Sequence, residues 1–247
     1  MTITGGLRLK ILAIDSSGLT ASCAITEGDL VLAEYTVSYK KTHSETLMPM
    51  IEAICSMTDT DVDLIDAVAV AKGPGSFTGL RIGSATAKGI AGAAGKPVIP
   101  VPTVDALAMN LWGCEDIIVP LMDARRNETY SGIYTFENGR LKIIRKQNAG
   151  PVDEVMEELG RIGKRVVFLG DGVPVFRDRI KEKLKTEHFF APASCNRQRA
   201  ACVGVLAAMY YSEGRYESAS AHKPEYLRMS QAERERMKKE NDRLRQA

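Results

Sequence analysis

The chain has 247 residues, of which 45% are hydrophobic and 26% are charged, and its formal net charge is +2. This size and composition are typical of a soluble globular protein with one large or two small domains. A charge so close to neutral excludes a general electrostatic affinity for nucleic acid. Any RNA contact must therefore come from a local basic patch.

The five cysteines are widely spaced and form no Cys-x-x-Cys pair. This pattern predicts free thiols in a reducing compartment. No apolar stretch approaches the about 20 residues of a membrane span. The first residues also lack the basic and then apolar segments of a secretory signal. We therefore expect a cytoplasmic protein that does not contact a membrane.

The first half of the chain alternates between apolar runs of strand length and segments with helical periodicity. Its first apolar run ends in Asp15, and a Glu27-Gly-Asp turn separates the next two. The expected strands are 9–14, 20–26, 30–38 and 66–71, and the expected helices are 44–57 and 76–93.

The second half repeats this pattern. Asp123 ends its first apolar run as Asp15 does, and Gly170-Asp-Gly matches Gly73-Pro-Gly. The expected strands are 117–122, 128–136, 141–146 and 166–169, with helices at 151–159 and from 174. The repeat predicts an α/β fold of two tandem lobes, each a mixed sheet with the order β-β-β-α-β-α.

This layout resembles that of the actin and Hsp70 superfamily, in which two lobes face a nucleotide cleft. We expect the first lobe over 1–106, the second over 107–228 and a charged tail over 229–247. A helix at about 198–213 is expected to pack back on the first lobe. Fold analogy places the cleft between Asp15 and Asp123.

The segment Gly73-Pro-Gly-Ser-Phe-Thr-Gly-Leu-Arg-Ile-Gly83 joins a predicted strand to a predicted helix that Ser76 can cap. Such a turn presents free backbone N–H groups and the positive end of the helix dipole to an anion. Neither the Walker motif nor the dinucleotide fingerprint fits it. The candidate ligand-binding residues are Asp15, Gly73, Gly75, Ser76 and Thr78. The alternative is a turn without a ligand, in which Asp15 bonds the next backbone N–H.

Small residues recur every four positions in the helix at 76–93, at Gly79, Gly83, Ala87 and Ala91. Glycine in a helix costs close to 1 kcal/mol relative to alanine, and close approach of another backbone can offset that cost. The approaching backbone belongs either to the chain's own sheet or to a second protein.

The helix at 44–57, with Ser44 as its expected N-cap, carries a full apolar stripe. Met48 and Cys55 add a second apolar side. Burial on two sides, one of them by a protein partner, is one interpretation, and an ordinary core helix is the other.

Reactive chemistry is sparse. None of the three histidines has a metal-ligand partner at the usual spacing, and no nucleophile elbow is present. We expect no cofactor and no enzyme activity. A stand-alone kinase or hydrolase of the actin fold is the alternative.

Several motifs together resemble the TsaB family, the non-catalytic subunit of the complex that forms threonylcarbamoyladenosine on tRNA. They are Ile11-Leu-Ala-Ile-Asp-Ser-Ser17, His43-Ser-Glu-Thr-Leu-Met-Pro49, the 73–83 segment, Asp123-Ala-Arg-Arg126 and Pro224-Glu-Tyr-Leu-Arg228. The resemblance implies a chain that supports modification of adenosine 37 by dimerising with the catalytic paralogue TsaD. It also implies that the ATPase TsaE joins the complex, and that the isolated chain pairs with itself.

The resemblance further implies that TsaD docks on the first two helices. The expected interface residues are His43, Ser44, Glu45, Leu47, Met48, Ile51, Cys55, Gly79, Arg81, Gly83 and Ala87. Contact with tRNA is expected to be at most indirect. The basic run at 234–245 is interleaved with acids, and neither Arg125-Arg126 nor Arg197-Gln-Arg199 comes with an aromatic platform.

Overall fold

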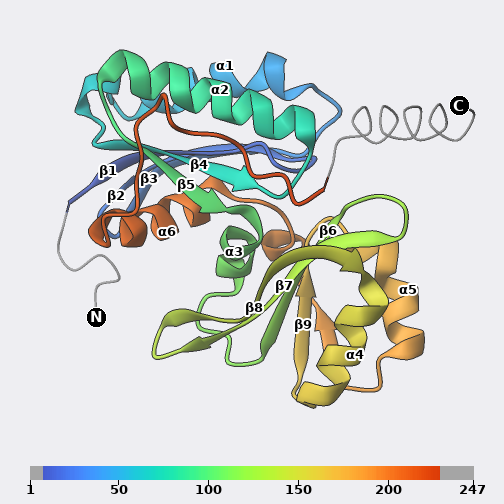
Figure 1. The fold of residues 1–247 in the computed structure, drawn as a ribbon. Helices are drawn as coiled ribbons and strands as arrows, with labels where there is room; N and C mark the ends of the chain where they lie inside the picture. Colours follow the sequence, from blue (N-terminus) through green and yellow to red (C-terminus); the bar gives the residue numbers. More distant parts are fainter. Residues whose placement is uncertain (1–7, 229–247) are drawn as a thin grey trace, which may run out of the picture.

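A computed structural model describes residues 8–228 of the chain, which form two lobes around two five-stranded mixed sheets (Figure 1). The first lobe contains strands β1 (Lys10–Asp15), β2 (Ala21–Glu27), β3 (Leu30–Val37), β4 (Ala67–Gly73) and β5 (Val98–Pro102), and helices α1 (His43–Met57) and α2 (Phe77–Ala94). Helix α6 (Ala200–Ser212) returns from the end of the chain to this lobe.

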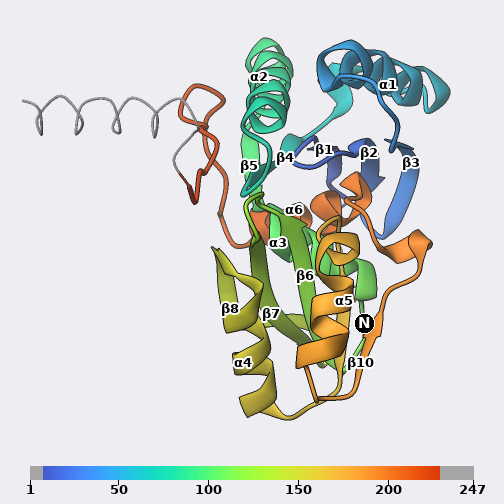
Figure 2. The same cartoon turned by 90° about the vertical axis from the view of Figure 1, so that its right-hand side faces the viewer.

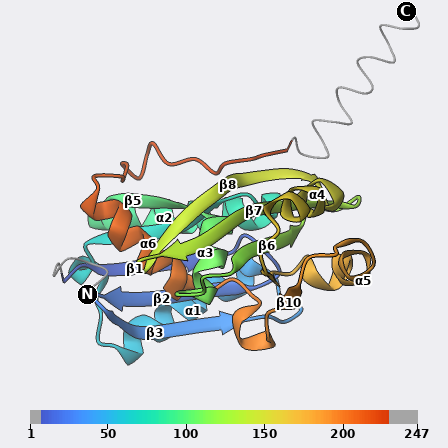
Figure 3. The same cartoon turned by 90° about the horizontal axis from the view of Figure 1, so that it is seen from below.

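The first sheet has the order β3-β2-β1-β4-β5, and Figure 3 shows β1, β2 and β3 side by side. β1 pairs antiparallel with β2 and parallel with β4. Helices α1 and α2 cover one face and α6 covers the other. Because the central strands are buried on both faces, they read as continuous apolar runs rather than as alternating patterns.

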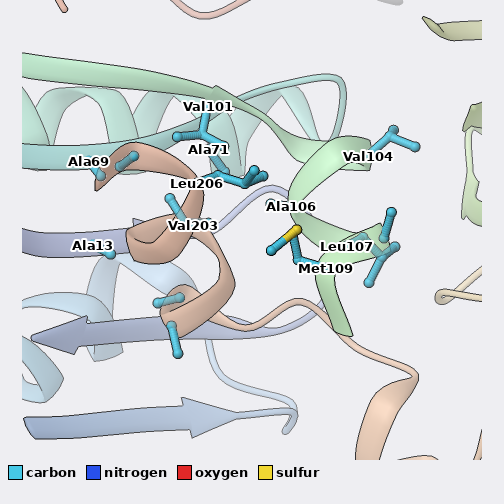
Figure 4. Packing of buried hydrophobic residues seen from close by; sticks show 14 of the residues in the cluster. Ala13, Ala69, Ala71, Val101, Val104, Ala106, Leu107, Met109, Val203 and Leu206 are labelled. Carbon is cyan, nitrogen blue, oxygen red and sulfur yellow. The ribbon is translucent and has the colours of Figure 1, made fainter. Parts of the chain in front are cut away.

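Alanines on β1 and β4 let α6 approach the sheet closely. Ala13, Ala69 and Ala71 face the α6 residues Val203 and Leu206 (Figure 4). Large side chains at the alternate positions of the same strands point toward α1 and α2 instead. The strand period of two thus gives the sheet one thin face and one thick face.

The second lobe repeats this plan. Its elements are β6 (Ile117–Asp123), β7 (Glu128–Glu137), β8 (Arg140–Pro151), α4 (Val152–Ile162), β9 (Val166–Leu169), α5 (Val173–Lys183) and β10 (His188–Phe190). The sheet order is β10-β9-β6-β7-β8, and α4 and α5 pack on one face. Helix α3 (Thr103–Ala108) joins the lobes and packs against the other face.

The predicted fold class is confirmed: each lobe has a mixed sheet with the β-β-β-α-β-α order. The expected strands and helices did not include three elements, β5, α3 and β10, because a proline-rich run, a six-residue helix and a three-residue strand leave little periodicity. The prediction of Ser44 as the N-cap of α1 was also wrong. Thr42 caps the helix, and the Glu45 carboxylate accepts from the Thr42 backbone N–H at 3.4 Å.

The chain after α6 crosses α2 as an extended strap, residues 215–228 (Figure 1). Glu217 pairs with Val98 beside β5, and the Glu225 N–H donates to the Lys72 carbonyl at 2.7 Å. The predicted tail over 229–247, with its basic run, lies outside the described residues. Among residues 8–228, no helix is both long enough and apolar enough to cross a membrane.

Candidate functional site

The predicted anion cradle at the glycine turn is filled by the chain's own backbone. A β-carbon on Gly75 would overlap the carbonyl oxygen of Ser17, which accepts a hydrogen bond from the Ser76 N–H at 2.7 Å. A β-carbon on Gly73, whose φ is +122°, would overlap the carbonyl oxygen of Glu225. These glycines therefore admit neighbouring protein strands, which is the ligand-free alternative.

The other candidate ligand residues also have local partners, apart from Thr78, which is exposed. The Ser76 hydroxyl accepts from the Gly79 N–H at 3.3 Å, so the predicted cap of α2 is confirmed. Asp15 is 1% exposed, and its Oδ1 accepts from Ser17 N at 2.9 Å and from Ser17 Oγ at 2.6 Å. Burial raises the pKa of Asp15 to about 6.

The interpretation that the small residues of α2 pack against a partner protein is wrong, because they pack against this chain. A β-carbon on Gly79 would overlap the Ser16 carbonyl oxygen, and one on Gly83 would overlap the Ser16 hydroxyl oxygen. Ala87 is fully buried in the core of the first lobe. The small residues of this face therefore let α2 approach the β1–β2 loop of the same chain.

The same correction applies to part of α1. Leu47 and Ile51 are buried against the first sheet, because they lie on its inward stripe. The remaining predicted interface residues are at least partly accessible. Ser44, Glu45, Met48 and Arg81 are exposed, and His43 and Cys55 are half-buried.

A different set of small residues lies on the outer face of α2. Ala85, Gly89, Gly92 and Ala93 are exposed, and a β-carbon on Gly89 would meet nothing within 4 Å. On the neighbouring α1, Met48 is 51% exposed. Figure 2 shows α1 and α2 side by side on one side of the molecule, away from the second lobe. We call the outer sides of these two helices the helical face.

A serine of α2 and a histidine and a glutamate of the strap form a hydrogen-bonded chain. Ser84 Oγ lies 3.0 Å from His222 Nε2, and His222 Nδ1 lies 2.8 Å from Glu217 Oε1. Ser84 is 4% exposed and His222 is 1% exposed. Sequence reasoning missed this arrangement, because 138 residues separate Ser84 from His222.

The segment Arg197-Gln-Arg199 mainly contacts other parts of the same chain. Gln198 is 1% exposed and packs against Gly18 in the β1–β2 loop. Arg199 forms an ion pair with Glu34 of β3. Within residues 8–228, no group of three His, Cys, Asp or Glu side chains is arranged to hold a metal ion.

Comparison with known proteins defines the family. Residues 31–236 match the family model "TsaD: tRNA N6-adenosine threonylcarbamoyltransferase". A Bacillus subtilis protein named tRNA threonylcarbamoyladenosine biosynthesis protein TsaB is 34% identical over 228 residues, covering 91% of this chain and 96% of that protein. The chain belongs to the TsaB family.

The Escherichia coli TsaB is 29% identical over 227 residues, covering 89% of this chain and 95% of that protein. A solved Pseudomonas aeruginosa structure, described as having similarity to peptidase YeaZ, superposes with a TM-score of 0.75 at 24% identity. It covers 89% of this chain and all of that one. This likeness shows that the two proteins share a fold.

Proposed function

We propose that the chain is the non-catalytic subunit of a complex that forms threonylcarbamoyladenosine on tRNA, and that it docks on the catalytic paralogue TsaD through its helical face. Family membership supports the pathway, since the Bacillus subtilis relative is named for this biosynthesis. The observation that carries the docking surface is the exposed strip of small residues on α2, flanked by an exposed methionine of α1.

The chemistry of the helical face suits another helix. Ala85 and Gly89 have little side chain, so a partner helix can approach the α2 backbone closely. Met48 is flexible and polarisable and can fill an irregular gap beside such a contact. Without a partner, the same surface pairs with a second copy of the chain. The ATPase TsaE joins through the assembled complex.

The packing around the glycine turn supports a subunit that does not itself bind a nucleotide at this turn. Backbone atoms of Ser17 and Glu225 take the space next to Gly75 and Gly73. The carboxyl of Asp15 is held by Ser17. Calorimetry of the isolated chain with ATP and magnesium tests this directly. We expect no binding at micromolar concentrations, and micromolar binding would favour the kinase alternative.

A serine hydrolase is the second candidate, because Ser84, His222 and Glu217 have the hydrogen-bond order of a catalytic triad. The burial of Ser84 and His222 argues against it, since a nucleophile must be reached by its substrate. A fluorophosphonate probe tests this candidate. We expect no adduct with the wild-type chain, and an adduct lost in Ser84→Ala would establish a hydrolase.

The docking proposal is tested by reconstituting tRNA modification from the chain and its catalytic paralogue. Met48→Glu places a charge on the helical face and should reduce modification about tenfold or more. Val175→Glu is the matched control, since Val175 is 55% exposed on α5 of the other lobe. Equal activity of the two variants would mean that the helical face is not the docking surface.

A further inference from the structure

The turn between β6 and β7 has an unusual backbone. Arg125, Arg126 and Asn127 have φ values of 66°, 58° and 61°, so three consecutive residues other than glycine are left-handed. Side chains disfavour this region, and such strain is retained only where neighbouring structure enforces it. We call these three residues the arginine turn.

The arginine turn is held from both sides. Asp123 Oδ1 accepts from Arg125 N at 2.8 Å, and the Glu128 N–H donates to the Arg125 carbonyl at 3.2 Å. From the end of the strap, Arg228 donates to the Ala124 carbonyl at 2.5 Å and pairs with Glu128 at 2.8 Å. The strap thus fixes the turn of the second lobe to the first lobe.

The fixed turn presents positive charge to solvent. The Arg125 side chain is 77% exposed, and Arg126 is exposed without an ion pair to any described residue. Arg125 forms an ion pair with Asp123 at 3.2 Å. The exposed Arg126 guanidinium, which forms no ion pair with a described residue, can therefore receive an external anion.

An aromatic platform lies next to this turn, two residues before Arg228 in the strap. Tyr226 stacks on Phe77 with ring centroids 4.5 Å apart and planes 10° apart. The Tyr226 hydroxyl accepts from Arg81 Nε at 3.2 Å, and Tyr226 remains 38% exposed. Phe77 of α2 and Tyr226 of the strap form this platform. Because these segments are far apart in the chain, the sequence alone could not place the platform beside the arginine turn.

Around this surface, five cationic side chains accompany three carboxylates. The cations are Arg81, Arg125, Arg126, Arg228 and Lys72, and the carboxylates are Asp123, Glu128 and Glu225. Guanidinium groups bind phosphodiesters, and exposed aromatic rings stack on unpaired bases. A positive surface with an aromatic ring therefore fits single-stranded RNA better than it fits an acidic protein.

We propose that the arginine turn and Tyr226 form a direct contact site for the tRNA substrate, with Arg126 on the phosphodiester backbone and Tyr226 beneath an unpaired base. This inference rests on the proposed function, and it replaces the expectation of indirect tRNA contact. The site lies at the junction of the two lobes, beside the first turn of α2. RNA bound there would border the helical face.

The test measures binding of fluorescent tRNA to the complex of this chain with its catalytic paralogue, over a range of salt concentrations. Arg126→Gly removes the charge and suits the left-handed backbone, so the variant should fold. We expect about threefold to tenfold weaker binding and a salt slope smaller by about 1. Arg140→Gly, at the exposed start of β8 beside the other end of β7, should bind as the wild type does.

Tyr226→Ala should weaken binding about tenfold. Its control is Tyr216→Ala, because Tyr216 is also an exposed strap tyrosine and stacks on Tyr211 at 5.0 Å. A structural role for Tyr226 would lower the melting temperature without changing the affinity of the folded complex for tRNA. The affinity is therefore measured at a temperature where both variants are folded.

Three results would overturn the inference. Wild-type tRNA affinity in Arg126→Gly and Tyr226→Ala complexes would refute it and leave the proposed function standing. Weaker binding of the paralogue by these variants would show that the surface contacts protein instead. Failure of the wild-type chain to bind the paralogue at all would refute the proposed function and this inference together.

Discussion

The hydroxyl oxygen of Ser16 lies in the space that a β-carbon on Gly83 would need, and this hydroxyl donates to the Gly79 carbonyl at 2.8 Å. The β1–β2 loop is thereby seated on α2 along a strip without side chains. Position 83 must be glycine for this contact. The requirement comes from within the chain and not from a partner.

Gly83→Ala and Gly89→Ala should therefore have opposite effects on stability, although both lie within α2. The new methyl group at position 83 meets Ser16, and we expect a loss of about 1–3 kcal/mol in the free energy of unfolding. The methyl group at position 89 meets nothing within 4 Å. Its better helix propensity should add about 0.5–1 kcal/mol.

Urea unfolding of the two variants and the wild type checks this pair. A stability loss at position 89 equal to that at position 83 would contradict the assignment of inner and outer faces on α2.

Asp15 should make stability depend on pH. Burial raises its folded-state pKa to about 6 from the ordinary 3.8, so the folded protein binds this proton more tightly than the unfolded chain does. Stability should therefore be highest below about pH 4 as far as this group is concerned, and fall as the pH rises to about 6. The full loss is on the order of 3 kcal/mol.

Asp15→Asn isolates this contribution. The asparagine Oδ1 can still accept from Ser17 N and Ser17 Oγ, but the side chain has no charge to bury. In urea unfolding at a series of pH values, the variant should gain on the wild type between pH 4 and 6 and stay more stable at pH 7. A constant difference across this range would show that Asp15 does not titrate there.

His222→Ala should release the middle of the strap. The buried imidazole joins Ser84 to Glu217, and both hydrogen bonds are lost in the variant. Losing a buried side chain and its partners should cost about 2–4 kcal/mol locally. We expect faster hydrogen–deuterium exchange at the Glu225 N–H of the strap, which donates to the Lys72 carbonyl.

The control for strap release is His188→Ala, since His188 is half-buried at β10 in the second lobe. Wild-type exchange at the Glu225 N–H in His222→Ala would mean that the other strap contacts hold this segment without the histidine.

The strands and the Ser76 cap could be predicted because their signals are local. Apolar runs of strand length and a serine before a helix act within a few residues. The four-residue spacing of Gly79, Gly83 and Ala87 likewise predicted one face of one helix. It could not say what that face meets, because the Ser16 loop lies more than sixty residues earlier in the chain.

In the candidate site, too, contacts between residues close in the chain could be predicted, and contacts between distant residues could not. Asp15 and Asp123 follow the predicted turn pattern, each accepting from a backbone N–H two residues on. The platform of Phe77 and Tyr226 and the buried Ser84–His222 contact join α2 to the strap. No spacing rule connects segments so far apart, so only the fold reveals them.

The most direct test of the helical face is the affinity of the chain for its catalytic paralogue, measured by isothermal titration calorimetry. Gly89→Leu and Gly160→Leu add the same side chain to exposed helical glycines, on α2 and on α4. If α2 docks on the paralogue through this face, Gly89→Leu should bind at least tenfold more weakly, by about 1.4 kcal/mol, and Gly160→Leu should keep the wild-type affinity. Wild-type affinity for Gly89→Leu would contradict docking through this face.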